Sequence, residues 1–366
     1  MLKFRTSGYS GFSVKYSSFF DNKIAVATSA NYGLAGNGRL YILSINPNGQ
    51  ITQDIYFDTQ DGLFDLSWSE INENHVAASS GDGTIKLFDL HVGTYPVAVW
   101  NEHHKEVFSI NWNLTDKSSF VSSSWDGTIK VWSANRKQSL VNLSSSSSTF
   151  APTTKPSSVP LSKSQKPGSN LTNTQCVYQA KVSPHAPNLI ASVNASSRLQ
   201  LWDVRSARPL QMDILCHNGL EALGLDWNKY RSTVLATSGV DKTIRVWDLR
   251  MITNKFPASH SLNGSNSAPQ NEMVGNQLPV RNVTWSPHSS NKLLSCGYDM
   301  TARIWDDVTD KRAPRTINNS TGCINSFNNH KEFVIGGDWS LWGEPGWVVT
   351  TGWDEMVYVW NSNRRY

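Results

Sequence analysis

Alternation of apolar and polar residues is the most regular feature of the chain. Residues 107–112 alternate in the way that is typical of a half-buried strand, and residues 63–68, 222–227 and 280–285 repeat the pattern. A short apolar segment follows each of these, and then come an Asp turn and a further strand, as in residues 125–132. We therefore predict repeating units of four strands, in which the third strand follows the Asp turn and commonly ends in Trp-Asp.

The Asp turn and the strand after it recur at a nearly constant interval. These strands end at seven positions: Leu43, Phe88, Trp132, Trp202, Trp247, Trp305 and Trp360. The first two intervals are 45 and 44 residues, which is the length of one blade in a WD40 propeller. The sequence therefore predicts an all-β fold, a seven-bladed WD40 β-propeller that forms a single domain over residues 1–366.

The longer intervals predict two polar insertions. Residues 144–170 are rich in Ser, Pro, Thr and Lys, and with so few apolar groups we expect a disordered loop. Residues 253–276 form a second polar insertion. The last repeat has no segment for its outer strand, so we expect residues 2–6 to supply that strand and close the ring. Closure would remove the exposed sheet edges.

Composition narrows the classes of function. The formal charge is +4 and no run of Lys or Arg occurs, so we expect no nucleic-acid binding. The four cysteines include no CxxC pair and are expected to be free thiols in a reducing compartment. The first residues lack the apolar core of a signal peptide, and no segment is apolar enough to insert into a membrane. No metal-ligand spacing or phosphate-binding loop occurs, so no metal or cofactor is expected.

Repeated His, Asp and Trp residues resemble the structural hydrogen-bond network of WD repeats. The expected members are His104, Asp126, Trp132, His217, Asp241, Trp247, Asp299, Trp305, His330, Asp354 and Trp360. A Ser-His-Asp catalytic triad would occur once, whereas this pattern recurs in several repeats. We therefore interpret these residues as structural.

Aromatic and acidic residues gather at positions that a WD propeller places on its top face, where the Asp turns and the starts of the inner strands lie. The residues before the turn Asp include three large aromatics, and carboxylates stand at the inner-strand starts. Our candidates for binding a peptide are Asp61, Phe64, Glu106, Phe108, Trp125, Glu221, Tyr298, Glu332 and Trp353. Two alternatives stay open, namely that the aromatics pack between blades and that the acids are ordinary solvated loop residues.

Several stretches are more specific than the repeats. Residues 11–23, 31–38 and 59–66, together with Gly352-Trp353-Asp354, resemble the peroxin-7 family of WD-repeat peroxisomal import receptors in a fungal version. The resemblance runs through the whole propeller except the two insertions. It implies a cytosolic receptor that cycles to the peroxisome, at its membrane or in its matrix, and that does not act as an enzyme.

The resemblance also implies partners. The family recognises the type-2 peroxisomal targeting signal of cargo proteins, a short N-terminal helix with a basic residue, aliphatic residues and a His or Gln. A co-receptor helps to hold that helix and brings the complex to the peroxisomal docking complex. By position, Asp61 and Glu106 are the first candidates for the basic residue of the cargo. The alternative function is a generic WD40 interaction scaffold or substrate adaptor.

Overall fold

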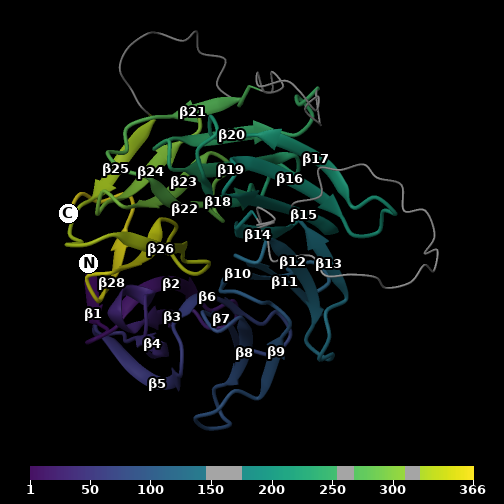
Figure 1. Cartoon of the computed structure of the whole chain (residues 1–366). Helices are drawn as coiled ribbons and strands as arrows, with labels where there is room; N and C mark the ends of the chain where they lie inside the picture. The colour runs from purple at the N-terminus through teal and green to yellow at the C-terminus, as the bar shows by residue number, and fades with distance from the viewer. Residues whose placement is uncertain (146–174, 254–267, 310–321) are drawn as a thin grey trace, which may run out of the picture.

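The computed structural model of the chain describes residues 1–145, 175–253, 268–309 and 322–366. Within these ranges, seven antiparallel sheets of four strands stand as blades around a central axis (Figure 1). The first strand of each blade lies innermost, and each later strand pairs with the one before it. The predicted seven-bladed β-propeller is thereby confirmed.

The blades are numbered here in chain order. Blades 1 and 2 consist of β2 (Ser10–Tyr16), β3 (Lys23–Ser29), β4 (Gly38–Ile45), β5 (Ile51–Thr59), β6 (Leu63–Trp68), β7 (His75–Ser80), β8 (Thr84–Asp89) and β9 (Ala98–Asn101). Blades 3 and 4 consist of β10 (Val107–Trp112), β11 (Ser119–Ser124), β12 (Thr128–Ser133), β13 (Val141–Ser144), β14 (Val177–Ser183), β15 (Ala186–Asn194), β16 (Arg198–Asp203) and β17 (Leu210–Leu215). Blades 5 and 6 consist of β18 (Ala222–Trp227), β19 (Val234–Gly239), β20 (Ile244–Asp248), β21 (Asn271–Met273), β22 (Val280–Trp285), β23 (Lys292–Gly297), β24 (Ala302–Asp306) and β25 (Cys323–Phe327). Blade 7 consists of β26 (Val334–Trp339), β27 (Trp347–Gly352), β28 (Met356–Asn361) and β1 (Leu2–Arg5).

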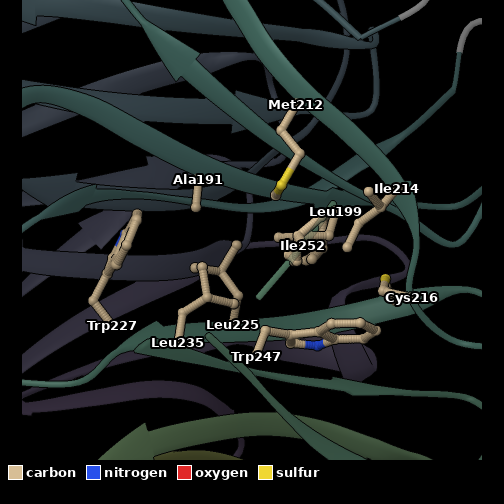
Figure 2. Packing of buried hydrophobic residues seen from close by; sticks show 12 residues of the cluster. Ala191, Leu199, Met212, Ile214, Cys216, Leu225, Trp227, Leu235, Trp247 and Ile252 are labelled. Carbon is tan, nitrogen blue, oxygen red and sulfur yellow. The ribbon is translucent and has the colours of Figure 1, made fainter. Parts of the chain in front are cut away.

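The hydrophobic core lies between neighbouring blades. Figure 2 shows one such cluster, in which Trp227, Leu235 and Trp247 of blade 5 face Ala191 and Leu199 of blade 4. These side chains are at most 1% exposed. Fully burying one large apolar side chain contributes about 1.5–3 kcal/mol, so the contacts between blades stabilise the ring as a unit. The tryptophans that end the repeats belong to this core.

The ring closes through β1, the first strand of the chain. Leu2 lies opposite Val359 and Arg5 lies opposite Met356 in an antiparallel pairing with β28. The expected closure by the N-terminal segment is therefore confirmed. Blade 7 thus joins strands from both ends of the chain, which lie close together in Figure 1.

The two predicted insertions fall mainly outside the described residues. Of residues 144–170, only 144 and 145 are described, and Ser144 ends β13. Residues 253–276 include 254–267, which lie outside the described residues, and then β21, whose Met273 pairs with Ile244 of β20. The second polar segment therefore contains the outer strand of blade 5. An outer strand needs few apolar residues, and for this reason composition gave no sign of it.

Candidate ligand-binding mouth of the propeller

Each inner strand has a bulge one or two residues after its start. At this point the register with the second strand shifts, as between Val107 and Ser109 in β10. An extra residue in one strand of an antiparallel pair re-aims its side chain. The seven residues between the shifted pairs are Phe12, Phe64, Phe108, Tyr178, Leu223, Arg281 and Ile335. All seven line one pocket on the top face, which we call the mouth.

Residues before the turn Asp complete the wall of the mouth. Trp125, Val240, Tyr298 and Trp353 line it. Each donates its backbone N–H to a carbonyl at the start of the inner strand, as Trp125 does to Glu106 at 3.1 Å and Trp353 does to Phe333 at 2.9 Å. These bonds fix the turn against the inner strand, so the aromatic side chain lies beside the bulged residue.

A series of ring contacts runs around the mouth, and we call it the aromatic arc. Its members, from blade 4 through blade 1 to blade 6, are Tyr178, Trp125, Phe108, Phe64, Phe12, Trp353, Phe333 and Tyr298. The closest pair is Phe108 and Trp125, whose rings stack with centroids 4.6 Å apart. Aromatic surface of this kind offers a large apolar area at a small cost in side-chain entropy.

Two carboxylates and one guanidinium line the same mouth. Glu106 and Glu221 are half-buried, and the hydroxyl of Tyr178 donates to Glu221 Oε2 at 3.0 Å. Burial and the negative charge of Glu221 together raise the pKa of Tyr178, so its hydroxyl stays protonated. Arg281 donates from Nη1 to the carbonyl of Leu223 at 3.0 Å, and its guanidinium lies 5.8 Å from the ring centre of Phe108. The mouth is therefore apolar with a small excess of negative charge.

The structure brings together most of the candidate peptide-binding residues. The seven that line the mouth are Phe64, Glu106, Phe108, Trp125, Glu221, Tyr298 and Trp353. Asp61 lies at its edge. Its carboxylate and the ring of Phe64 both lie next to Gly81, where a Cβ atom would be 2.9 Å from Asp61 Oδ1 and 3.2 Å from Phe64 Cε2. Glu332 is exposed and does not line the mouth.

Nine of the residues that line the mouth were not among the candidates from the sequence. Phe12, Tyr178, Leu223, Arg281 and Ile335 occupy the bulged position. The others are Tyr32, Gly33, Leu34 and Val240. The residue type at the bulged position varies from Phe to Arg, so the sequence carries no repeated signal for it.

A network of side-chain hydrogen bonds holds the turns that carry the mouth residues. In blade 5, Trp247 Nε1 donates to Thr237 Oγ1 at 2.9 Å, Thr237 lies 2.8 Å from His217 Nε2, and His217 Nδ1 lies 2.8 Å from Asp241. His330, Thr350, Asp354 and Trp360 repeat this arrangement in blade 7. In blade 6 the described partners of Asp299 include Thr301 and Arg303, and Trp305 donates to Ser295.

The His104 assignment in this network was wrong. The histidine of blade 3 is His103, whose Nδ1 lies 2.9 Å from Asp126 and whose Nε2 lies 2.8 Å from Ser122, the acceptor for Trp132. His104 is exposed and contributes its backbone N–H to Asp126. The sequence alone does not distinguish His103 from His104, because the two are adjacent. The backbone N–H of His104 bonds to Asp126, and this bond directs the side chain of His103 into the blade.

Charged side chains also line the channel beyond the mouth, and they link neighbouring blades. Asp226 accepts bonds from Lys181 at 3.0 Å and from the backbone N–H of Trp285 at 2.8 Å. Burial would raise the pKa of Asp226, but Lys181 and Lys229 outweigh it and lower the pKa. Asp338 similarly accepts from the backbone N–H of Tyr16 at 3.0 Å. These groups have a structural use within the ring.

Comparison with known proteins assigns the chain to a family. Residues 94–133, 211–248 and 267–306 match the family described as WD domain, G-beta repeat. A protein of Komagataella phaffii described as peroxisomal targeting signal 2 receptor is 52% identical, and the alignment covers both chains in full. The chain belongs to the family of peroxisomal targeting signal 2 receptors. Family members of the same description in Saccharomyces cerevisiae and Mus musculus are 46% and 31% identical, over 99% and 98% of this chain and 100% and 95% of their own length.

The family assignment confirms the resemblance to peroxin-7 that residues 31–38 and 59–66 suggested. Two further observations concern only the part of the chain that the structure describes. In it, no helix has the length and apolar character needed to cross a membrane. In the same part, no group of three or more His, Cys, Asp or Glu side chains is arranged to hold a metal ion.

Proposed function

We propose that this member of the family is a receptor for the N-terminal type-2 peroxisomal targeting signal helix of cargo proteins. It binds that helix in the mouth and, with a co-receptor, delivers the cargo for import into the peroxisomal matrix. It acts by binding and not by catalysis. It cycles between the cytosol and the peroxisome, where the loaded receptor meets the docking complex.

The composition of the mouth carries this proposal. An amphipathic helix with a basic residue needs an apolar surface for one face and a carboxylate within reach of its cation. The aromatic arc supplies the first requirement, and Glu106 and Glu221 supply the second in the same pocket. Because both carboxylates are half-buried, an ion pair formed there is stronger than one on an open surface.

The test measures binding of a fluorescein-labelled type-2 signal peptide, with and without a candidate co-receptor, by fluorescence anisotropy. Glu106→Gln and Glu221→Gln should each weaken binding about tenfold, or about 1.4 kcal/mol, because each removes a partner of the basic residue. Trp125→Ala should weaken it at least as much, because Trp125 contributes part of the aromatic arc. Glu332→Gln is the matched control, since Glu332 lies outside the mouth.

A second peptide, in which the basic residue is Ala, completes the experiment. It should bind the wild type weakly and should lose little more on Glu106→Gln or Glu221→Gln, because the charge pair is already absent. A wild-type protein that fails to bind the signal peptide even with a functional co-receptor would overturn the proposal. Equal losses of affinity for both peptides would mean that the basic residue of the signal does not contact Glu106 or Glu221.

A further inference from the structure

The connection between β3 and β4 differs from the matching turns in the other blades. In blade 3 only residues 125–127 separate β11 from β12, whereas residues 30–37 separate β3 from β4 and include the short 3₁₀ helix η1 (Ala30–Gly33). The backbone N–H of Ala30 donates to the carbonyl of Asn37 at 2.8 Å and closes the base of this loop. Residues 30–37 are called the blade 1 loop below.

The backbone of the blade 1 loop is strained. Asn31 and Tyr32 have φ angles of 47° and 58°, and Gly33 follows with 76°. The left-handed region is unfavourable for a residue with a Cβ atom, and two such residues in succession are uncommon. No residue of η1 is buried, so burial in the core does not offset the strain. Strain of this kind gathers at sites that hold ligands.

The blade 1 loop lies directly against the mouth. A Cβ atom on Gly33 would lie 2.8 Å from Phe12 Cζ and 2.9 Å from Phe64 Cε1, so only glycine fits there. The ring of Tyr32 lies 5.4 Å from that of Trp353. Tyr32, Gly33 and Leu34 all line the mouth. The loop therefore adds a wall to the pocket that the bulged residues form.

Two apolar side chains of this wall face solvent. Tyr32 is 51% exposed and Leu34 is 88% exposed. A side chain as exposed as that of Leu34 adds little to the stability of the free protein. Their place beside the aromatic arc and the carboxylates Glu106 and Glu221 fits an amphipathic, basic ligand that is also held from the side.

We propose that Tyr32 and Leu34 clamp the flank of the signal helix in the mouth. The aromatic arc contacts one apolar side of the helix, and Tyr32 and Leu34 contact the adjacent side. The strained, preorganised loop keeps both side chains in position before the helix arrives, which lowers the entropic cost of binding. This inference rests on the proposed function and names two specificity-determining residues for it.

The experiment uses the full chain and the same fluorescein-labelled signal peptide. The variant Tyr32→Ala/Leu34→Ala should weaken binding at least tenfold and leave Tm within about 2 °C of the wild type. The matched control Tyr95→Ala/Val92→Ala removes side chains that are 80% and 62% exposed in the connection between β8 and β9, and it should bind within twofold of the wild type. Gly33→Ala should also weaken binding, because the new methyl group displaces the loop from Phe12 and Phe64.

The outcomes separate the two proposals. If Trp125→Ala and Glu106→Gln weaken binding while the Tyr32→Ala/Leu34→Ala variant binds within twofold of the wild type, the clamp is overturned and the mouth stands. If the wild type does not bind the peptide, the receptor proposal fails and the clamp fails with it. If the control Tyr95→Ala/Val92→Ala loses as much affinity as the clamp variant, the effect is not specific to the blade 1 loop and the clamp is overturned.

Discussion

At the scale of single residues, one position in each inner strand decides the chemistry of the mouth. The bulge lifts one side chain per blade into the pocket, and six of the seven are apolar or aromatic. Arg281 is the exception. Its guanidinium extends towards Phe108 of blade 3 and brings a positive charge into the pocket that Glu106 and Glu221 also line. It therefore reduces the attraction of the mouth for a basic ligand.

Replacement of Arg281 by Met should strengthen binding of the basic signal peptide. At a separation of about 10 Å and an intermediate dielectric constant, one like charge is worth roughly 0.5–1 kcal/mol, so the expected gain is about two- to fivefold. The measurement is Kd by anisotropy at 50 and 300 mM salt, since the gain should shrink as salt screens the charges. Arg281→Lys keeps the charge and should leave Kd unchanged. Weaker binding by Arg281→Met would mean that Arg281 contacts the ligand directly.

At the scale of one turn and its neighbouring strands, buried side-chain networks hold the Asp turns. In blade 5, Trp247 donates to Thr237 Oγ1, and His217 Nε2 and Nδ1 lie 2.8 Å from Thr237 Oγ1 and from Asp241. A neutral imidazole with its proton on Nδ1 fits this arrangement, because Nδ1–H then donates to the carboxylate and Nε2 accepts from the hydroxyl. Burial lowers the pKa of His217, although the carboxylate of Asp241 opposes the effect. His217 is therefore neutral in the folded protein and titrates in the unfolded chain.

Stability should fall as the pH is lowered from about 6.5 to 5.5. The unfolded chain takes up a proton at His217 near its ordinary pKa of about 6.5, whereas the folded protein does not. The free energy of unfolding therefore falls by up to about 1.4 kcal/mol for each pH unit in this window. His217→Gln should lower Tm at pH 7.5 and make its further decline towards pH 5.5 shallower. Thermal unfolding at several pH values measures both effects. The exposed His91→Gln is the control and should keep the wild-type slope, and an unchanged slope in His217→Gln would contradict this assignment.

Much of the element-level structure could be predicted because the same pattern of strands and Asp turns recurs in several repeats. The Asp turns, their strands and the closure by residues 2–5 all follow from position within a repeat. Features that depend on one local geometry could not be predicted. The bulge leaves no mark in composition, so Phe12, Tyr178 and Arg281 were missed as a set. Glu106 and Glu221 directly precede their inner strands, whereas Glu332 stands one residue earlier and Phe333 takes the equivalent position in blade 7, so Glu332 lies outside the mouth.

At the scale of the whole molecule, one short strand completes the ring. The β1 side chains Leu2 and Phe4 pack on a core cluster that includes Val357 and Val359, so the strand adds apolar contacts as well as ladder hydrogen bonds. The ion pair of Arg5 and Glu355 is a smaller contribution, because the Arg5 side chain is 67% exposed. Without β1, strand β28 would become the edge of its sheet.

Deletion of residues 1–5 should lower the free energy of unfolding by at least about 3 kcal/mol and promote association through the free edge of β28. The estimate counts about 1 kcal/mol for each of several ladder hydrogen bonds and about 1–2 kcal/mol for each partly buried apolar side chain. Thermal unfolding measures the loss, and size-exclusion chromatography detects the association, because an unpaired strand edge is a template for another chain. Arg5→Ala is the control and should cost less than about 1 kcal/mol. A synthetic peptide of residues 1–8 should restore Tm by adding the missing strand, whereas a scrambled peptide should not. A truncated chain that stays monomeric with an unchanged Tm would show that closure by β1 does not stabilise the propeller.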